Sequence, residues 1–267
     1  MANHSSGYNR TTAWFVVGFI VVVTAAVIVA GALSSGSGGT TAATGDGFVS
    51  STAAAITSSD HAIGNPNAKV TLIEYGDFEC PACGDYESIV QQIINNDSSS
   101  LLFVFRNYPL TSIHPFAMVG SQAAEAAGVL GGPSKYWEMH NLLYSKQTEW
   151  STNGNLTPAQ VLSQYLNGYA QSIGLNVTQF DAAMSSPQVT DKIQNDINSG
   201  NAAQINHTPT FFINLQQIPN PTSASNFEDV INNAIAAAGS NNASSTGVGP
   251  APASGTSSAI GATSTQK

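Results

Sequence analysis

The sequence predicts an α/β domain with an inserted helical subdomain, preceded by one N-terminal transmembrane helix. Two observations define the organisation: an uncharged apolar run covers positions 14–33, and large apolar residues otherwise gather between positions 61 and 239. The third observation is that, between positions 61 and 239, the hydrophobic patterns predict elements in the order strand, helix, strand, several helices, strand, helix. This order is typical of a sheet whose parallel strands are joined by helices.

The N-terminal apolar run, 14–33, contains no charged residue. At about 1.5 Å per helical residue it spans the core of a bilayer, which predicts a transmembrane anchor. A signal peptide is the alternative, because small residues around Ala32 suit a peptidase, although the apolar part of a signal is usually shorter. Arg10 lies on the short leading side and the next basic residue is Lys69. The positive-inside rule therefore places residues 1–13 in the cytoplasm and the rest of the chain outside.

Two segments have compositions that do not favour a packed core. Residues 34–60 and 240–267 consist mainly of Ser, Gly, Thr and Ala. Such segments bury too little apolar surface to offset the entropy lost on ordering. We expect the first to be a flexible linker and the second to be a disordered tail.

The region 61–239 begins with a predicted strand, helix and strand. Val70, Leu72 and Glu74 alternate with the residues between them, and this period of two predicts a strand. Pro81 suits the first turn of a helix, and apolar residues recur after it at the spacing of one helical face. The continuous apolar run 101–105 then predicts a strand that is buried on both faces and parallel to the first.

The middle third of the region has helical patterns and the last part returns to a strand and a helix. Helix-spaced apolar residues occur at Tyr136, Met139 and Leu143, and at Val161, Tyr165 and Tyr169. We expect the helical insertion to extend from about 111 to 201. The β-rich run 210–213 predicts a strand, and a helical pattern follows it.

Charge and cysteine content exclude several classes of protein. The net charge of −9 and the 9% of charged residues argue against a nucleic-acid binder, which needs a basic face. Two cysteines cannot form a disulfide-rich scaffold or a cysteine-only zinc site. They allow one bond or one reactive pair.

The two cysteines enclose Pro81 and Ala82 where the first strand ends and its helix begins. Unpaired N–H groups and the helix dipole stabilise negative charge there, so a thiolate at Cys80 is favoured. Cys83 lies one turn further, close enough to attack a mixed disulfide. This arrangement predicts redox chemistry. A structural disulfide and a metal site are the alternatives, although a bridge across two residues closes too short a loop to stabilise a fold much.

Three stretches resemble the DsbA-like branch of the thioredoxin-fold disulfide oxidoreductases. They are 70–83, which ends in the cysteine pair, 103–110, and 208–214 with its Thr-Pro step before a strand. The resemblance covers about 180 of the 267 residues, the length of the region 61–239. It implies a thioredoxin-like fold with an inserted helical subdomain and a thiol:disulfide exchange activity.

The resemblance also implies roles for the catalytic residues. Cys80 attacks the substrate and Cys83 resolves the mixed disulfide. Glu74 matches a buried acid that handles the proton of the resolving cysteine, and its place in the strand pattern puts it on the core side. The alternative is an acid at the edge of the sheet that reaches solvent. Glu87 matches a second acidic position, for which we expect an ordinary surface acid on the helix.

A second set of implied residues contacts the substrate. Pro209 belongs to the catalytic site as a cis-proline that packs beside the cysteine pair. The peptide group of Thr208 pairs with an extended substrate as an added strand, and Pro81 and Ala82 complete the substrate-binding surface. From the residues alone, a proline at the start of a strand is ordinary and needs no cis bond.

The expected redox strength is moderate. Strong oxidants of the family carry a histidine before the second cysteine, where this chain has Ala82. Asp77, Glu79 and Asp85 add negative charge near the thiols, which disfavours a thiolate. We therefore expect a weaker oxidant than the strongest family members, with Cys80 titrating above about pH 4.5.

Other polar residues give weaker signals. His114, His140 and His207 would supply zinc ligands together with the thiols, but their spacing matches no zinc motif. We expect neither a metal nor an external cofactor, because the cysteine pair carries the electrons. At Asn214 and Leu215, where related chains often have Asn-Gly, the leucine argues against a two-residue hairpin.

The resulting functional hypothesis is an enzyme in the cell membrane, with one membrane span and its catalytic domain outside the cytoplasm. It oxidises cysteine pairs in secreted or membrane proteins, acts as a monomer, and is reoxidised by a quinone-linked membrane partner. The alternatives are a disulfide reductase or isomerase, a thiol-dependent metal carrier, and a peptide-binding module without turnover.

Overall fold

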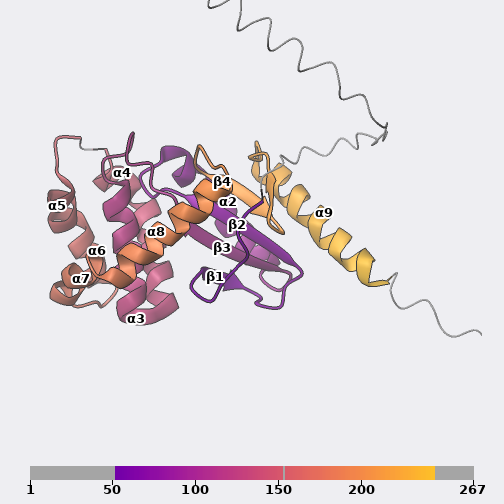
Figure 1. The fold of residues 1–267 in the computed structure, drawn as a ribbon, viewed down its shortest axis with the longest axis horizontal. Coiled ribbons are helices and arrows are strands. Elements are labelled where there is room, and N and C mark those ends of the chain that lie inside the picture. Colours follow the sequence, from indigo (N-terminus) through magenta and orange to yellow (C-terminus); the bar gives the residue numbers. More distant parts are fainter. Residues whose placement is uncertain (1–51, 153, 244–267) are drawn as a thin grey trace, which may run out of the picture. The chain divides into compact units, whose positions relative to one another are not determined.

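The computed structural model describes residues 52–152 and 154–243 (Figure 1). Their strands form a five-stranded sheet in the order β1-β3-β2-β4-β5. The strands are β1 (His61–Gly64), β2 (Val70–Gly76), β3 (Leu101–Asn107), β4 (Thr210–Ile213) and β5 (Gln216–Ile218). β2 and β3 are parallel, and the other neighbouring pairs are antiparallel. The predicted parallel strand-helix-strand unit is confirmed.

Helices connect and cover the strands. α2 (Pro81–Asp97) joins β2 to β3, and α9 (Ala224–Ala243) follows β5. Between β3 and β4 lie α3 (Ala117–Ser145), α4 (Gln147–Trp150), α5 (Pro158–Val161), the π-helix η1 (Leu162–Leu166), α6 (Asn167–Ser172), α7 (Val177–Met184) and α8 (Pro187–Ala202). In Figure 1 the strands lie between α9 on one side and α3 to α8 on the other. The predicted α/β class and the helical insertion are therefore confirmed.

β2 is buried on both faces, and this places Glu74. Val70 and Leu72 belong to the main hydrophobic core, together with Val90 of α2 and Phe227 of α9. Side chains alternate between the two faces of a strand, so Glu74 points toward the same core. Ile73 and its neighbours on the other face form a second, smaller core.

Residues 52–60 belong to the folded domain, although the sequence predicted a flexible linker through Asp60. The side chain of Asp60 accepts two hydrogen bonds from the buried guanidinium of Arg106, at 2.8 and 2.9 Å. Arg106 also donates to the backbone carbonyls of Ala54 and Ala55. The prediction is wrong here because a buried guanidinium needs several acceptors, and this polar segment supplies them.

The predicted transmembrane segment, 14–33, lies outside the described residues. So do residues 1–13, which were predicted to be cytoplasmic, the first part of the predicted linker, and residues 244–267. Within 52–152 and 154–243, no helix combines the length and the apolar character that crossing a membrane requires. α9 extends to Ala243, so the predicted start of the tail at 240 is a few residues too early.

β4 and β5 form the two-residue hairpin that Leu215 argued against. Asn214 and Leu215 both have positive φ, 48° and 70°. The side chain of Asn214 accepts a hydrogen bond from the N–H of Thr71 at 2.9 Å, and the carbonyl of Leu215 accepts one from Ala53 at 2.8 Å. Contacts with neighbouring segments thus stabilise a leucine in a conformation that usually favours glycine.

Candidate active site

The cysteine pair lies at the N-terminus of α2, directly after β2. Cys80 is the N-cap residue, with φ −66° and ψ 119°, and Pro81 opens the first turn. Both cysteines are free thiols. Cys80 is 7% exposed and Cys83 is fully buried, whereas Pro81 and Ala82 between them are exposed. A reactant therefore reaches Cys80 before it reaches Cys83.

The loop before β4 completes this site. The peptide bond between Thr208 and Pro209 is cis, as the resemblance implies. The carbonyl oxygen of Thr208 lies 3.4 Å from the sulfur of Cys80, which donates a hydrogen bond to it. Because β4 pairs with β2, the sheet brings together two segments that lie far apart in the sequence.

The pKa values of the two thiols are shifted in opposite directions. The pKa of Cys80 is lowered to about 5, chiefly by a hydrogen bond from Cys83, while burial acts against this. The side chain of Thr208 and the N–H groups of Ala82 and Cys83 lower it further. Burial raises the pKa of Cys83 well above its usual value, and its contact with Cys80 adds to the rise. The pair thus favours a thiolate at Cys80 and a thiol at Cys83.

Glu74 is buried behind the thiols, at 2% exposure. Its pKa is raised well above the usual range, first because burial disfavours a carboxylate and then because Glu87 and Cys80 carry like charge. Glu74 in turn raises the pKa of Cys83. The alternative of an edge acid that reaches solvent is therefore wrong, and the site favours the protonated form of Glu74.

Glu87 is not the surface acid that we expected. Its side chain is only 13% exposed and its Oε1 lies 3.7 Å from Nδ1 of His140. Burial raises its pKa to about 7, although a hydrogen bond from Gln91 acts against this. Glu87 lies four residues after Cys83, so both face the core from the same side of α2. The four-residue spacing from Cys83 is thus a feature of the sequence from which the burial of Glu87 could have been predicted.

Asp77 and Glu79 are bound to partners of their own. Asp77 accepts hydrogen bonds from the N–H groups of Glu79 and Leu110, both at 2.9 Å, and lies 2.7 Å from His114. Glu79 accepts from the N–H of Phe116. The main causes of the pKa shift at Cys80 include neither acid. The sequence overestimated their effect because it could not show these donors.

The three histidines considered as metal ligands lie in different surroundings. His114 pairs with Asp77, His140 is buried among aromatic rings, and His207 is exposed with its Nδ1 next to Asn206. In the described part of the chain, no three acidic, histidine or cysteine side chains are arranged to hold a metal ion.

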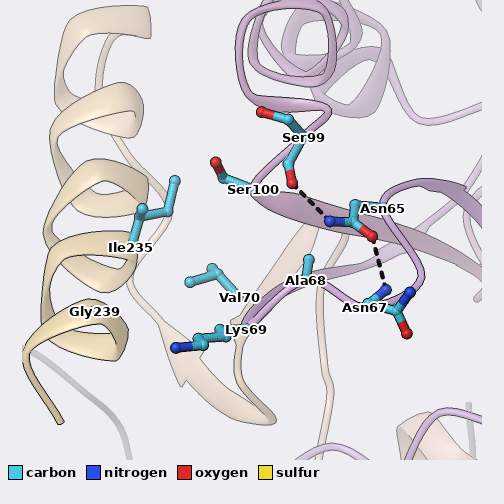
Figure 2. Close-up of a pocket in the computed structure, with 9 residues that line it drawn as sticks. All are labelled: Asn65, Asn67, Ala68, Lys69, Val70, Ser99, Ser100, Ile235 and Gly239. Carbon is cyan, nitrogen blue, oxygen red and sulfur yellow. Dashed lines mark hydrogen bonds between the residues drawn. The ribbon is translucent and has the colours of Figure 1, made fainter. Parts of the chain in front are cut away.

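Two hollows of this domain lie away from the thiols. One hollow, of about 290 Å³, lies at the start of β2. Figure 2 shows Ile235 of α9 on one side of it and Asn65 on the other. Cys80 follows the other end of β2. A second hollow of about 400 Å³ lies between the start of α3 and α7 and includes Met118 and Met184. Neither hollow is lined by a cysteine.

A family model described as thioredoxin matches residues 57–233. The chain belongs to the thioredoxin family. Solved structures share the fold: BdbD from Bacillus subtilis, in its oxidised form, aligns with a TM-score of 0.60 at 20% identity, covering 72% of this chain and 100% of that chain. Wolbachia pipientis α-DsbA1 aligns with a TM-score of 0.60 at 20% identity, and the alignment covers 70% of this chain and 96% of α-DsbA1. The thioredoxin fold with a DsbA-like helical insertion is thereby established.

Curated relatives of the thioredoxin-like region are much longer proteins. The Na(+)/H(+) antiporter NhaA 1 of Salinispora arenicola is 36% identical over 169 residues, which are 63% of this chain and 24% of the antiporter. NhaA 3 of Salinispora tropica is 32% identical over 193 residues, 72% of this chain and 27% of the antiporter. The chain spans about a quarter of the length of these relatives. The similarity therefore does not transfer the antiport activity.

Proposed function

We propose that the chain is a thiol:disulfide oxidoreductase that oxidises cysteine pairs in other proteins. One observation carries this proposal: at the N-terminus of α2, the pKa of Cys80, the more exposed of the two thiols, is lowered to about 5, and the pKa of the fully buried Cys83 is raised. A stabilised thiolate at Cys80 favours the reduced pair over the disulfide, which makes the disulfide an oxidant. No external cofactor is needed, because both sulfur atoms belong to the chain.

The exchange proceeds in two displacements. A substrate thiolate attacks the sulfur of Cys80 in the Cys80–Cys83 disulfide, a mixed disulfide forms, and Cys83 leaves as a thiolate. The second substrate thiolate then attacks the substrate sulfur of the mixed disulfide, forms the substrate disulfide and releases the thiolate of Cys80. Two electrons pass from the substrate to the pair. The proton of Glu74 goes to the leaving thiolate of Cys83, which has the higher proton affinity.

The substrate contacts the surface around Cys80. Pro81 and Ala82 are exposed beside it, and the backbone of Thr208 offers hydrogen-bonding groups to an extended polypeptide. Pro209 holds this backbone against the cysteine pair. These contacts involve no particular side chain of the substrate, so the class of substrate is a flexible segment with a reduced cysteine pair.

The cellular setting is part of the proposal. The apolar run 14–33 anchors the chain in the cell membrane with residues 1–13 in the cytoplasm, and the domain acts outside as a monomer. Disulfides persist in such compartments. A quinone-linked membrane protein reoxidises the pair. A reductase is the second candidate, because a pKa of about 5 lies between the ≈ 3.5 of the strongest oxidant and the ≈ 7 of thioredoxin.

Transfer to a reduced peptide with two cysteines tests the proposed direction. The oxidised full-length chain in detergent should convert about one equivalent of peptide to its disulfide without oxygen. Alkylation followed by mass spectrometry should then find Cys80 and Cys83 as thiols. If the peptide stays reduced while the reduced chain efficiently reduces the oxidised peptide, the direction is that of a reductase. Cys80→Ser is the control that must transfer nothing.

A further inference from the structure

The helical insertion contacts the redox centre through Gln147, the first residue of α4. Its Nε2 donates hydrogen bonds to the backbone carbonyls of Phe78 and Cys80, both at 2.9 Å. Both bonds are buried and link residues nearly seventy positions apart, 69 and 67. The two carbonyls lie on either side of Glu79, in the turn that leads into α2. One carboxamide thus fixes the backbone at the cysteine pair.

Gly84 of α2 shows how closely this carboxamide packs. A Cβ at position 84 would lie 2.6 Å from Oε1 of Gln147 and 3.1 Å from its Cδ. Real Cβ contacts are essentially never as short as 2.6 Å, so the amide packs directly against the first turn of α2. The N–H of Gly84 donates to the carbonyl of Cys80 at 3.2 Å. That carbonyl therefore accepts one hydrogen bond from its own helix and one from the insertion.

Contacts of Trp150 with α3 and Phe78 fix the position of α4. Trp150 at its end is fully buried, and its Nε1 donates to the carbonyl of Leu143 in α3 at 2.9 Å. A Cβ at Gly120 of α3 would lie 3.0 Å from the ring of Trp150 and 3.2 Å from Cβ of Phe78. The packing of α3, α4 and Phe78 leaves Gln147 little freedom to move.

We propose that Gln147 is a positioning residue of the redox centre, which keeps the N–H groups of Ala82 and Cys83 directed at the sulfur of Cys80. The inference rests on the proposed exchange function and adds the residue through which the insertion acts on it. Without the two N–H groups of Gln147, the carbonyl of Phe78 loses this donor and the carbonyl of Cys80 keeps only the N–H of Gly84, so the turn shifts to regain hydrogen bonds. The N–H groups then stabilise the thiolate of Cys80 less well.

The test replaces Gln147 by methionine, which keeps the length of the side chain and removes both donors. In the full-length, reduced chain, the pH dependence of iodoacetamide labelling at Cys80 gives the pH midpoint of its titration. We expect Gln147→Met to raise this midpoint by about one unit, and to move the equilibrium with glutathione about tenfold toward the disulfide. Gln147→Glu should raise the midpoint further, because its carboxylate adds negative charge beside the thiolate. Thr148 is the exposed neighbour of Gln147, and Thr148→Ala should change neither the midpoint of Cys80 nor the equilibrium with glutathione.

Two outcomes separate this inference from the proposed function. A folded Gln147→Met chain with an unchanged midpoint overturns the role of Gln147. A wild-type chain that does not exchange with glutathione overturns the proposed function, while the titration of Cys80 still tests Gln147. If the methionine variant does not fold, Gly84→Ala applies the same test, because its Cβ must displace the carboxamide. An unshifted midpoint in that folded variant also contradicts the proposal.

Discussion

Replacing Cys83 by serine is expected to leave substrate proteins covalently trapped on Cys80. Without Cys83 the chain cannot form its own disulfide, so it cannot oxidise reduced substrates. The thiolate of Cys80 still attacks the disulfides of oxidised substrates, and the chain has no second thiol to release the resulting mixed disulfide. Turnover should fall on the order of 10³-fold or more, as is usual when a reacting group is removed. Non-reducing electrophoresis of the full-length variant, followed by mass spectrometry, should show adducts at Cys80 that disappear with a reductant.

The same experiment separates enzyme from binding module. Cys80→Ser and the double variant Cys80→Ser/Cys83→Ser should form no adducts and show no turnover. A peptide-binding module without redox chemistry would hold peptides equally well in the double variant. If the double variant retains the full activity of the wild type, the exchange mechanism is wrong.

Replacing Glu74 by glutamine is expected to slow exchange on the order of 10²-fold, the low end of the usual contribution of a general acid. The amide keeps the shape of the carboxyl group but has no proton to give to the leaving thiolate of Cys83. Stopped-flow measurement of the step that releases Cys83 from the disulfide should show the loss. Glu138→Gln is the matched control, since Glu138 is an exposed acid paired with Lys135, and its exchange rate should not change.

Glu74 also gives the protein a pH-dependent stability with a definite sign. Its pKa is raised in the folded state, so the folded chain holds a proton that the unfolded chain releases above about pH 4.3. The wild type therefore loses stability as the pH rises from that value toward the folded-state pKa. Glu74→Gln lacks this loss, so its free energy of unfolding should equal that of the wild type at pH 4 and exceed it at pH 8. If the variant instead becomes less stable than the wild type as the pH rises from 4 to 8, the fold stabilises Glu74 as a carboxylate.

Local patterns in the sequence predicted the centre of the site. The strand before Cys80 and the proline after it fixed the cysteine pair at the start of a helix, and the period of two placed Glu74 on the core side. Thr208 and Pro209 carry no local signal for their place beside the pair. Only the resemblance indicated them, because strand pairing in the sheet brings them there.

The parts that the sequence missed depend on contacts between distant segments. Gln147 looks like any polar residue in a helical region until the fold places it under the carbonyls of Phe78 and Cys80. Segment 52–60 has the composition of a linker, and its order comes from the buried Arg106. β1 and β5 are too short to show a clear period, and they exist because longer strands beside them supply the pairing groups.

The reduction potential of the Cys80–Cys83 pair is the most direct test of the proposed oxidase. The full-length chain is equilibrated with glutathione buffers, trapped with acid, and the states of both cysteines are measured. A potential between about −120 and −180 mV, within the range of known oxidants and isomerases, is the result that we predict. A value below about −250 mV would contradict it and indicate a reductase, and a pair that does not equilibrate with glutathione would contradict exchange chemistry altogether.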